Sequence, residues 1–161
     1  MGPVLFLIFI NDIDIGIHNA MLKFADDTKL FGTVQTEDQH TCLQTDLAIL
    51  EEWASNWQMQ FNVSKCKVLH VGRKNRKLEY SMGNRLLESV KEEKDLGVLI
   101  SDNLKSSRQC QAAYSKANQM LGMIRRTISY KSKGIMVPLY KSIVRPLVEY
   151  CTPAWFGQVV L

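Results

Sequence analysis

The sequence predicts an α+β chain whose C-terminal part is helical. Apolar and polar residues alternate over residues 21–31, which is typical of a strand pair. Apolar residues recur every three or four positions over residues 37–58 and again after residue 110, which is typical of amphipathic helices. With 161 residues, 46% hydrophobic and 22% charged, the chain lies in the globular range and differs from disordered chains. It can hold one domain, or one domain with a small appendage.

The N-terminal segment is an apolar run, VLFLIFI, that follows Pro3. Proline at a first helical position favours a helix, although so short a run also fits a buried strand. The run is much shorter than the about 20 residues that cross a bilayer. No basic residue precedes it, and Asn11, Asp12 and Asp14 follow it, which is not typical of a signal peptide. We therefore expect a core segment in an intracellular protein of the nucleus or cytoplasm that is not secreted and meets no membrane.

The stretch KFADDTKLF, residues 23–31, carries two adjacent carboxylates inside an alternating run. Four residues around the pair share one parity: Leu22, Phe24, Thr28 and Leu30. The pattern predicts a β-hairpin with Asp26 and Asp27 at or beside its turn, because aspartate tolerates turn backbones.

Residues 37–102 predict one long helix and then short strands. Five apolar residues share one face of the helix: Leu43, Leu47, Leu50, Ala54 and Trp57. A strand over residues 66–72 ends at a glycine. Turn signals separate further short strands, which we expect at residues 77–83, 84–90 and 95–102.

Two helices are expected in the last third of the chain. The first has a stripe of six apolar residues: Cys110, Ala113, Ala117, Leu121, Ile124 and Ile128. The second begins near Leu139 and is bent or interrupted at Pro146. We expect Tyr114, Trp53 and Trp57 to be core residues.

Charge divides the chain into an acidic front and a basic rear. Residues 1–64 carry two basic and nine acidic side chains, a net of −7, whereas residues 65–161 carry eighteen and seven, a net of +11. The cluster RKNRK at residues 73–77 is typical of polyanion binding or of a solvated surface.

The cysteines do not form a recognisable framework. The chain has four, Cys42, Cys66, Cys110 and Cys151, and no C-x-x-C pair. We expect buried thiols and no disulfide-linked partner. A zinc site from four residues is the alternative, but their spacing is not that of a zinc finger: His40, Cys42, Cys66 and His70.

Paired carboxylates at a turn can share one cation. Two close carboxylates repel each other unless a cation neutralises them, and hard oxygen ligands suit Mg²⁺ beside substrate phosphates. A two-metal site would stabilise the attacking and leaving oxygens of an in-line displacement at phosphorus. The alternative is a solvated acidic turn.

Six stretches, in order, resemble one family. FADDTKLF is similar to the Phe/Tyr-x-Asp-Asp hairpin of reverse transcriptases, specifically the jockey-like branch of non-LTR retrotransposons. Five others resemble that branch: GPVLFLIFINDI, LAILEEWASNWQMQFNVSKCKVLHVG, KDLGVLISDNL, KANQMLGMIRR and LYKSIVRPLVEYCTPAW. The resemblance implies part of a right-hand polymerase palm over residues 1–104, with a catalytic β-hairpin, a helix, short antiparallel strands and the primer-grip strands. A helical, thumb-like region over residues 105–161 would follow.

The resemblance also implies roles for individual residues. Asp26 and Asp27 would be catalytic ligands of Mg²⁺, and Lys65 would approach the nucleotide phosphates. Four residues would contact the primer: Phe24, Ala25, Leu96 and Gly97. Seven would hold the backbone of an RNA template and DNA primer: Arg73, Lys74, Arg76, Lys77, Lys116, Arg125 and Arg126.

The chain departs from the family pattern at its start. The family's fingers and first metal-binding aspartate lie upstream of the segment that Gly2 and Pro3 begin. We therefore expect an incomplete reverse transcriptase that is inactive alone, unless a fingers and palm portion of the same polyprotein completes it. The alternatives are a non-catalytic nucleic-acid-binding remnant and an unrelated two-carboxylate hydrolase. We also expect exposed apolar surface around Leu5, Phe6 and Phe9.

Overall fold

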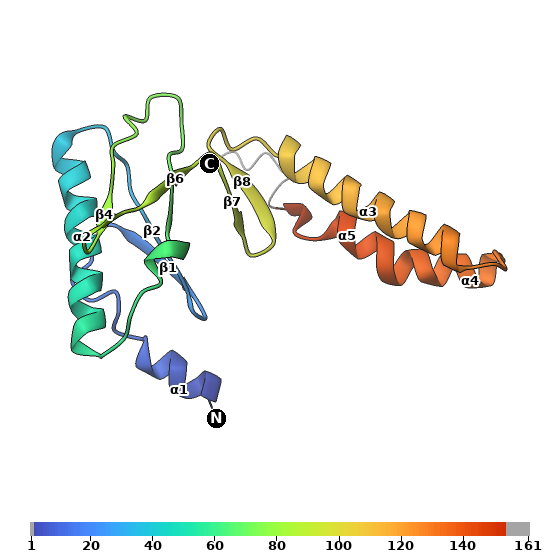
Figure 1. Cartoon of the computed structure of the whole chain (residues 1–161), viewed down its shortest axis with the longest axis horizontal. Helices are drawn as coiled ribbons and strands as arrows, with labels where there is room; N and C mark the ends of the chain where they lie inside the picture. Colours follow the sequence, from blue (N-terminus) through green and yellow to red (C-terminus); the bar gives the residue numbers. More distant parts are fainter. Residues whose placement is uncertain (1, 154–161) are drawn as a thin grey trace. The chain divides into compact units, whose positions relative to one another are not determined.

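The structure is a computed structural model that describes residues 2–153 (Figure 1). The chain divides into two compact units, Met1–Val90 and Lys91–Leu161, and each is considered by itself. This division lies before the strand pair that the sequence placed with the palm. The expected thumb-like region reaches residue 161, and its last eight residues lie outside the described part.

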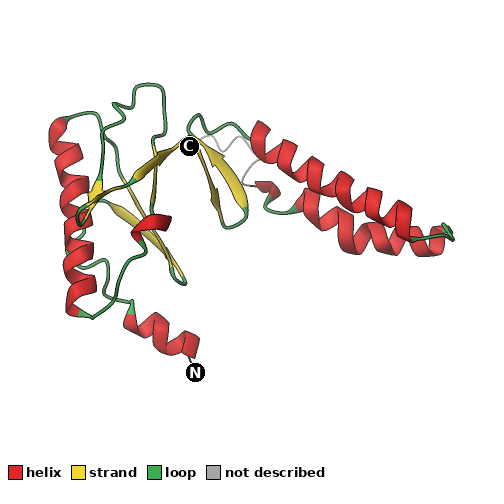
Figure 2. Cartoon of the chain, viewed as in Figure 1, coloured by secondary structure: helices red, strands yellow, loops and turns green. Residues whose placement is uncertain are grey.

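The first unit holds two helices, a short helical turn and six strands (Figure 2). Their bounds are α1 (Gly2–Phe9), β1 (Ala20–Phe24), β2 (Asp27–Phe31), α2 (Glu37–Asn56), η1 (Val63–Lys65), β3 (Lys67–Leu69), β4 (Ser81–Met82), β5 (Arg85–Leu86) and β6 (Glu88–Val90). The predicted N-terminal helix, hairpin and long helix are confirmed.

Helix α2 organises the core of the first unit. Thr36 and Gln39 form a capping box at its start, which satisfies backbone N–H groups that have no partner within the helix. Its buried face carries Leu50, which packs with Ile13 and Met82. Partly buried residues complete this cluster, among them Met21 of β1, Val63 of η1 and Cys66, which precedes β3.

The strands of the first unit pair in three two-stranded sheets. The pairs β1–β2 and β4–β5 are antiparallel hairpins, as expected for short strands joined by turns. The pair β3–β6 is parallel, so the expectation of short antiparallel strands is wrong for this pair. The β4–β5 hairpin lies between β3 and β6 in the chain. This long connection lets β6 return beside β3 and run in the same direction as β3.

The second unit holds a hairpin followed by helices. Its elements are β7 (Glu92–Asp95), β8 (Val98–Ser101), α3 (Ser107–Thr127), α4 (Lys133–Leu139), a π-helical turn η2 (Tyr140–Val144) and α5 (Arg145–Glu149). The residue pattern alone predicted one strand over residues 95–102, and this is corrected, because a two-residue turn at Leu96 and Gly97 separates β7 from β8. The strand pair that the family resemblance implied here is present. Both turn residues have a left-handed backbone, with φ of 44° and 87°.

Small residues let the helices of the second unit pack closely. Ala117 and Ile124 of α3 and Val144 of η2 form the buried cluster. Tyr114 is 67% exposed, so the expectation that it is a core residue is wrong. It directly follows the buried Ala113, and adjacent helical residues point about 100° apart.

The interruption near Pro146 is confirmed as a change of helical geometry. The Arg145 N–H donates to the Tyr140 carbonyl, which is a π-type bond, and α5 begins at Arg145, directly before Pro146. Proline has no N–H and its ring crowds the preceding turn, so an extra residue in that turn relieves the clash.

Helix α1 is mostly exposed, so the expectation that its apolar run is a core segment is wrong. Leu5 is exposed as expected, together with Val4, Leu7 and Ile8. Phe6 and Phe9 are only partly exposed, and Phe9 packs edge-on against Trp53 and Trp57 with ring centroids 6.0 and 5.2 Å apart. Trp57 is itself exposed rather than a core residue. Among the described residues, no helix combines the length and apolarity needed to cross a membrane.

Candidate functional site

The two aspartates lie at the turn of the β1–β2 hairpin, as predicted. Phe24 pairs with Asp27 across the hairpin, which leaves Ala25 and Asp26 as the two loop residues. Both aspartates are exposed, and so is Phe24, at 61%. The carboxylates therefore stand at a tight, solvent-facing turn, where a ligand has access to them.

Ala25 holds this turn in a left-handed backbone conformation, with φ of 52°. A side chain costs roughly 1–2 kcal/mol in that region, and glycine avoids the cost but loses about 0.4–1 kcal/mol through its more flexible unfolded chain. We expect Ala25→Gly to stabilise the first unit by up to about 1 kcal/mol in urea denaturation. A lower denaturation midpoint would contradict this account of the turn.

The hairpin is anchored by a buried carboxylate that the sequence analysis missed. Asp46 of α2 has no exposed surface. Its Oδ1 accepts from the His18 N–H at 2.9 Å, and its Oδ2 accepts from the backbone N–H and side-chain Nδ2 of Asn19 at 2.9 and 2.8 Å. The His18 Nδ1 lies 3.0 Å from Oδ1. These two residues immediately precede β1, so Asp46 fixes the start of the hairpin.

Asn19 also lies against the chain just after β2, the second strand of the hairpin. A Cβ at Gly32, the residue after β2, would overlap the Asn19 side-chain oxygen. Lys23 of β1 gives a further attachment, because its Nζ donates to Asp14 Oδ1 at 2.8 Å and to the Asn11 carbonyl at 2.9 Å. The hairpin is thus held at its base by Asn19, and Lys23 attaches β1 again one residue before Phe24.

Electrostatics favours the charged form of the anchor. Burial opposes the charge on Asp46, but the hydrogen bonds from His18 and Asn19 outweigh it and hold the pKa of this carboxyl below its usual value. The sequence carried a signal that could have found it: an aspartate on the apolar face of α2, three residues after the buried Leu43.

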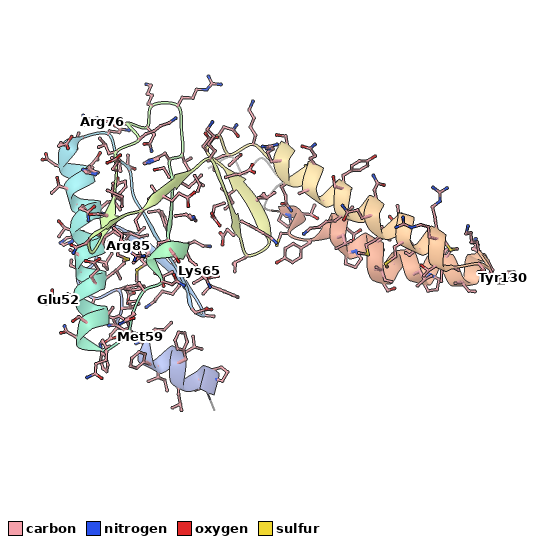
Figure 3. The ribbon with its side chains drawn as sticks, in the orientation of Figure 1. Glu52, Met59, Lys65, Arg76, Arg85 and Tyr130 are labelled. Atoms are coloured by element: carbon pink, nitrogen blue, oxygen red, sulfur yellow. The ribbon has the colours of Figure 1, made fainter. Side chains whose placement is uncertain are left out.

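Lys65 ends the short turn η1 and is exposed. Val63 and Cys66, on either side of it, pack against the same core that Met21 of β1 reaches. Lys65, labelled in Figure 3, therefore lies on η1, which packs against the same core cluster as the hairpin. Its approach to nucleotide phosphates stays a prediction.

The donor set at the turn suits a hard cation. Asp26 and Asp27 offer carboxylate oxygens, which Mg²⁺ accepts. Among residues 2–153, no third histidine, cysteine or acidic residue joins them, since the one such group of three is His18, Cys42 and Asp46. The role of Asp26 and Asp27 as metal ligands stays a prediction.

The four residues considered for zinc do not gather. The His40 ring lies 4.8 Å from that of Tyr80, and its Nε2 is 3.0 Å from the Glu79 carbonyl. His70 is buried with its Nε2 3.3 Å from Ser89 Oγ, and burial lowers its pKa. Both imidazoles therefore have structural contacts.

The basic loop of the first unit, residues 73–77, joins β3 to β4. Arg73, Lys74 and Lys77 are exposed. Arg76, labelled in Figure 3, pairs with Glu37 at 3.1 Å, so its charge is partly neutralised.

The helices of the second unit carry the larger cationic surface. Residues 103–148 contain nine basic side chains and no acidic one. Lys116, Arg125 and Arg126 of α3 are exposed. Tyr130 is 74% exposed at the connection from α3 to α4, where Figure 3 shows it at the end of the helical pair. Sequence analysis did not single out Tyr130, although lysine follows it directly.

The second predicted primer contact is the turn between β7 and β8. Leu96 and Gly97 are its two residues, and both are exposed. Phe24 and Ala25 lie at the corresponding turn of the first unit. The seven basic candidates and four primer candidates are thus divided between two units.

Comparison with known proteins decides the family. The sequence profile of the family described as "Reverse transcriptase (RNA-dependent DNA polymerase)" matches residues 1–124. The chain belongs to the reverse transcriptase family. The expected membership is confirmed, and the alternative of an unrelated hydrolase is set aside.

A curated relative supports the jockey-like branch of reverse transcriptases. The chain is 27% identical over 164 residues to the "RNA-directed DNA polymerase from mobile element jockey" of Drosophila melanogaster. The match covers 93% of this reverse transcriptase chain and 18% of the relative, so the chain spans about a fifth of that protein's length. No solved structure matches the chain significantly.

Proposed function

We propose that the chain is the palm and thumb portion of a retrotransposon reverse transcriptase that holds an RNA template and DNA primer. The observation that supports this most is the Asp26–Asp27 pair at the exposed turn of an anchored hairpin, in a chain of this family. The buried Asp46 anchor keeps the turn in place while the carboxylates stay accessible.

Asp26 and Asp27 are the proposed ligands of Mg²⁺, with Asp26 the more direct ligand and Asp27 the supporting one. When bound, Mg²⁺ would stabilise negative charge on the attacking and leaving oxygens of nucleotidyl transfer. Lys65 would hold or protonate the leaving phosphates, which suits an exposed lysine on a supported turn.

The remaining residues would hold the duplex. Phe24 and Ala25 would contact the primer end from the first unit, and Leu96 and Gly97 from the second. The cations of α3 and of the basic loop would contact phosphates without reading sequence.

Two carboxylates bind Mg²⁺ weakly, so we propose that the chain alone binds a template–primer duplex without extending the primer. The test uses Mn²⁺ as a paramagnetic probe of the full chain. We expect Mn²⁺ to broaden the backbone amide NMR signals of residues 24–28. The double variant Asp26→Asn with Asp27→Asn should lose this broadening. The control Glu52→Gln, on the exposed face of α2, should leave it unchanged. Broadening spread evenly over exposed acidic residues would overturn the site.

A second candidate is a non-catalytic nucleic-acid-binding protein. The acid-free segment 103–148 favours it, because phosphate binding needs no metal ligand. Salt-dependent duplex binding without Mn²⁺ broadening at the hairpin would favour this candidate. Primer extension by the full chain with Mg²⁺ would contradict both the second candidate and the proposed inactivity.

A further inference from the structure

We propose that Tyr150 is a positioning residue that fixes the Leu96–Gly97 turn to the end of α5. The turn would then keep a constant place relative to the cationic helices of the same unit. This inference rests on the proposed function of that turn as a primer contact.

Tyr150 contacts the turn in two ways. Its hydroxyl donates a hydrogen bond of 2.7 Å to the Leu96 carbonyl, a group outside the paired residues of β7 and β8. Its ring lies over Gly97, where a Cβ would be 3.0 Å from Cε1 and 3.4 Å from the hydroxyl oxygen. Both the left-handed backbone and the nearby ring therefore favour glycine at residue 97.

The backbone of Tyr150 is itself held in place by α5. Tyr150 is the C-cap residue that follows α5, and its backbone N–H donates to the Pro146 carbonyl at 3.0 Å. Two residues earlier, Val148 packs against the cluster of Ala117, Ile124 and Val144. The position of the Tyr150 ring is therefore set by the packing of α5 on α3.

A separate contact holds the body of the hairpin. The Leu99 N–H donates to Oε1 of the buried Gln109 of α3 at 2.9 Å. Arg108 pairs with Glu92 at 3.2 Å. Because these contacts hold the strands without Tyr150, loss of its hydroxyl should release the turn and leave the rest of the hairpin in place.

This arrangement has a functional consequence. Cations on α3 would grip the duplex backbone, and the turn would meet the primer end. Tyr150, 54 residues after Leu96 in sequence, would fix the distance between these two contacts. It would act through the turn and not touch the reacting atoms.

The test is photocrosslinking from a primer with a 3′-terminal 4-thiothymidine, bound with its RNA template to the full chain. We expect the wild-type chain to crosslink within residues 92–101. Tyr150→Phe should lower that crosslink yield roughly fivefold, because one hydrogen bond is lost. The affinity for the duplex should stay unchanged within twofold. Tyr114→Phe is the matched control, since Tyr114 is an exposed tyrosine on α3. An unchanged crosslink yield in Tyr150→Phe would overturn the proposal.

Hydrogen exchange separates this inference from the proposed function. In Tyr150→Phe the amides of residues 96–98 should exchange about fivefold faster, whereas those of β8 near Gln109 should not change. Gly97→Ala should be less harmful in a Tyr150→Ala background, because the steric part of its cost is removed. Absence of any wild-type crosslink at the turn would count against the primer contact alone. Unchanged exchange at residues 96–98 would remove the role of Tyr150.

Discussion

Replacing Asp46 with alanine is expected to lower the unfolding free energy of the first unit by about 3–5 kcal/mol. The carboxylate is fully buried and accepts hydrogen bonds from His18 and Asn19, so its loss leaves their N–H groups without partners. The loss is a large fraction of the whole stability of a small domain, which is roughly 5–15 kcal/mol. Urea denaturation followed by tryptophan fluorescence measures it.

Control variants and the pH dependence of stability distinguish the specific role of Asp46 from a general effect of removing a negative charge. Glu52→Gln removes an exposed carboxylate from the same helix and should change the midpoint little. The folded-state pKa of Asp46 is lowered, so its contribution is full above the unfolded value of about 3.9 and is lost as pH falls through the folded value. Asp46→Asn should reduce this acid dependence, and the part due to Asp14, whose pKa is also lowered by Lys23, should persist. An acid dependence equal to that of wild type would contradict the assignment.

Neutralising three cations of α3 is expected to weaken template–primer binding roughly 10- to 100-fold near 100 mM KCl. The triple variant is Lys116→Gln, Arg125→Gln and Arg126→Gln. All three side chains are exposed, and in the described part of the chain none forms an ion pair. Because each phosphate contact releases counterions, the slope of log Kd against log salt should fall by roughly 2–3. Fluorescence anisotropy over a KCl series measures both quantities.

The matched control removes cations that already have acidic partners. Arg108 pairs with Glu92 at 3.2 Å, and Arg145 pairs with Glu149 at 2.6 Å. Arg108→Gln with Arg145→Gln should therefore change the salt slope less per charge than the α3 variant. Equal effects per charge would show that net charge alone governs binding and that α3 has no special place.

Local patterns predicted the elements around the candidate site. Alternation about Asp26 and Asp27 placed the hairpin turn correctly, because a period of two and a pair of turn-tolerant residues are both local properties. The period of α2 was equally clear, since one face had to meet a core. Local patterns failed at the Leu96–Gly97 turn, where an apolar residue adopts a left-handed backbone within an apparent strand.

The sequence by itself determined that two carboxylates occupy a hairpin turn and that the rear of the chain is cationic. Only the tertiary structure assigned Asp46 to the base of that hairpin and Tyr150 to the turn of the next one. These hydrogen bonds join residues 28 and 54 positions apart, and they depend on which helix face packs where. Periodicity reports which residues share a face of one element, whereas a partner across the fold is chosen by packing and by the cost of leaving a buried polar group unpaired.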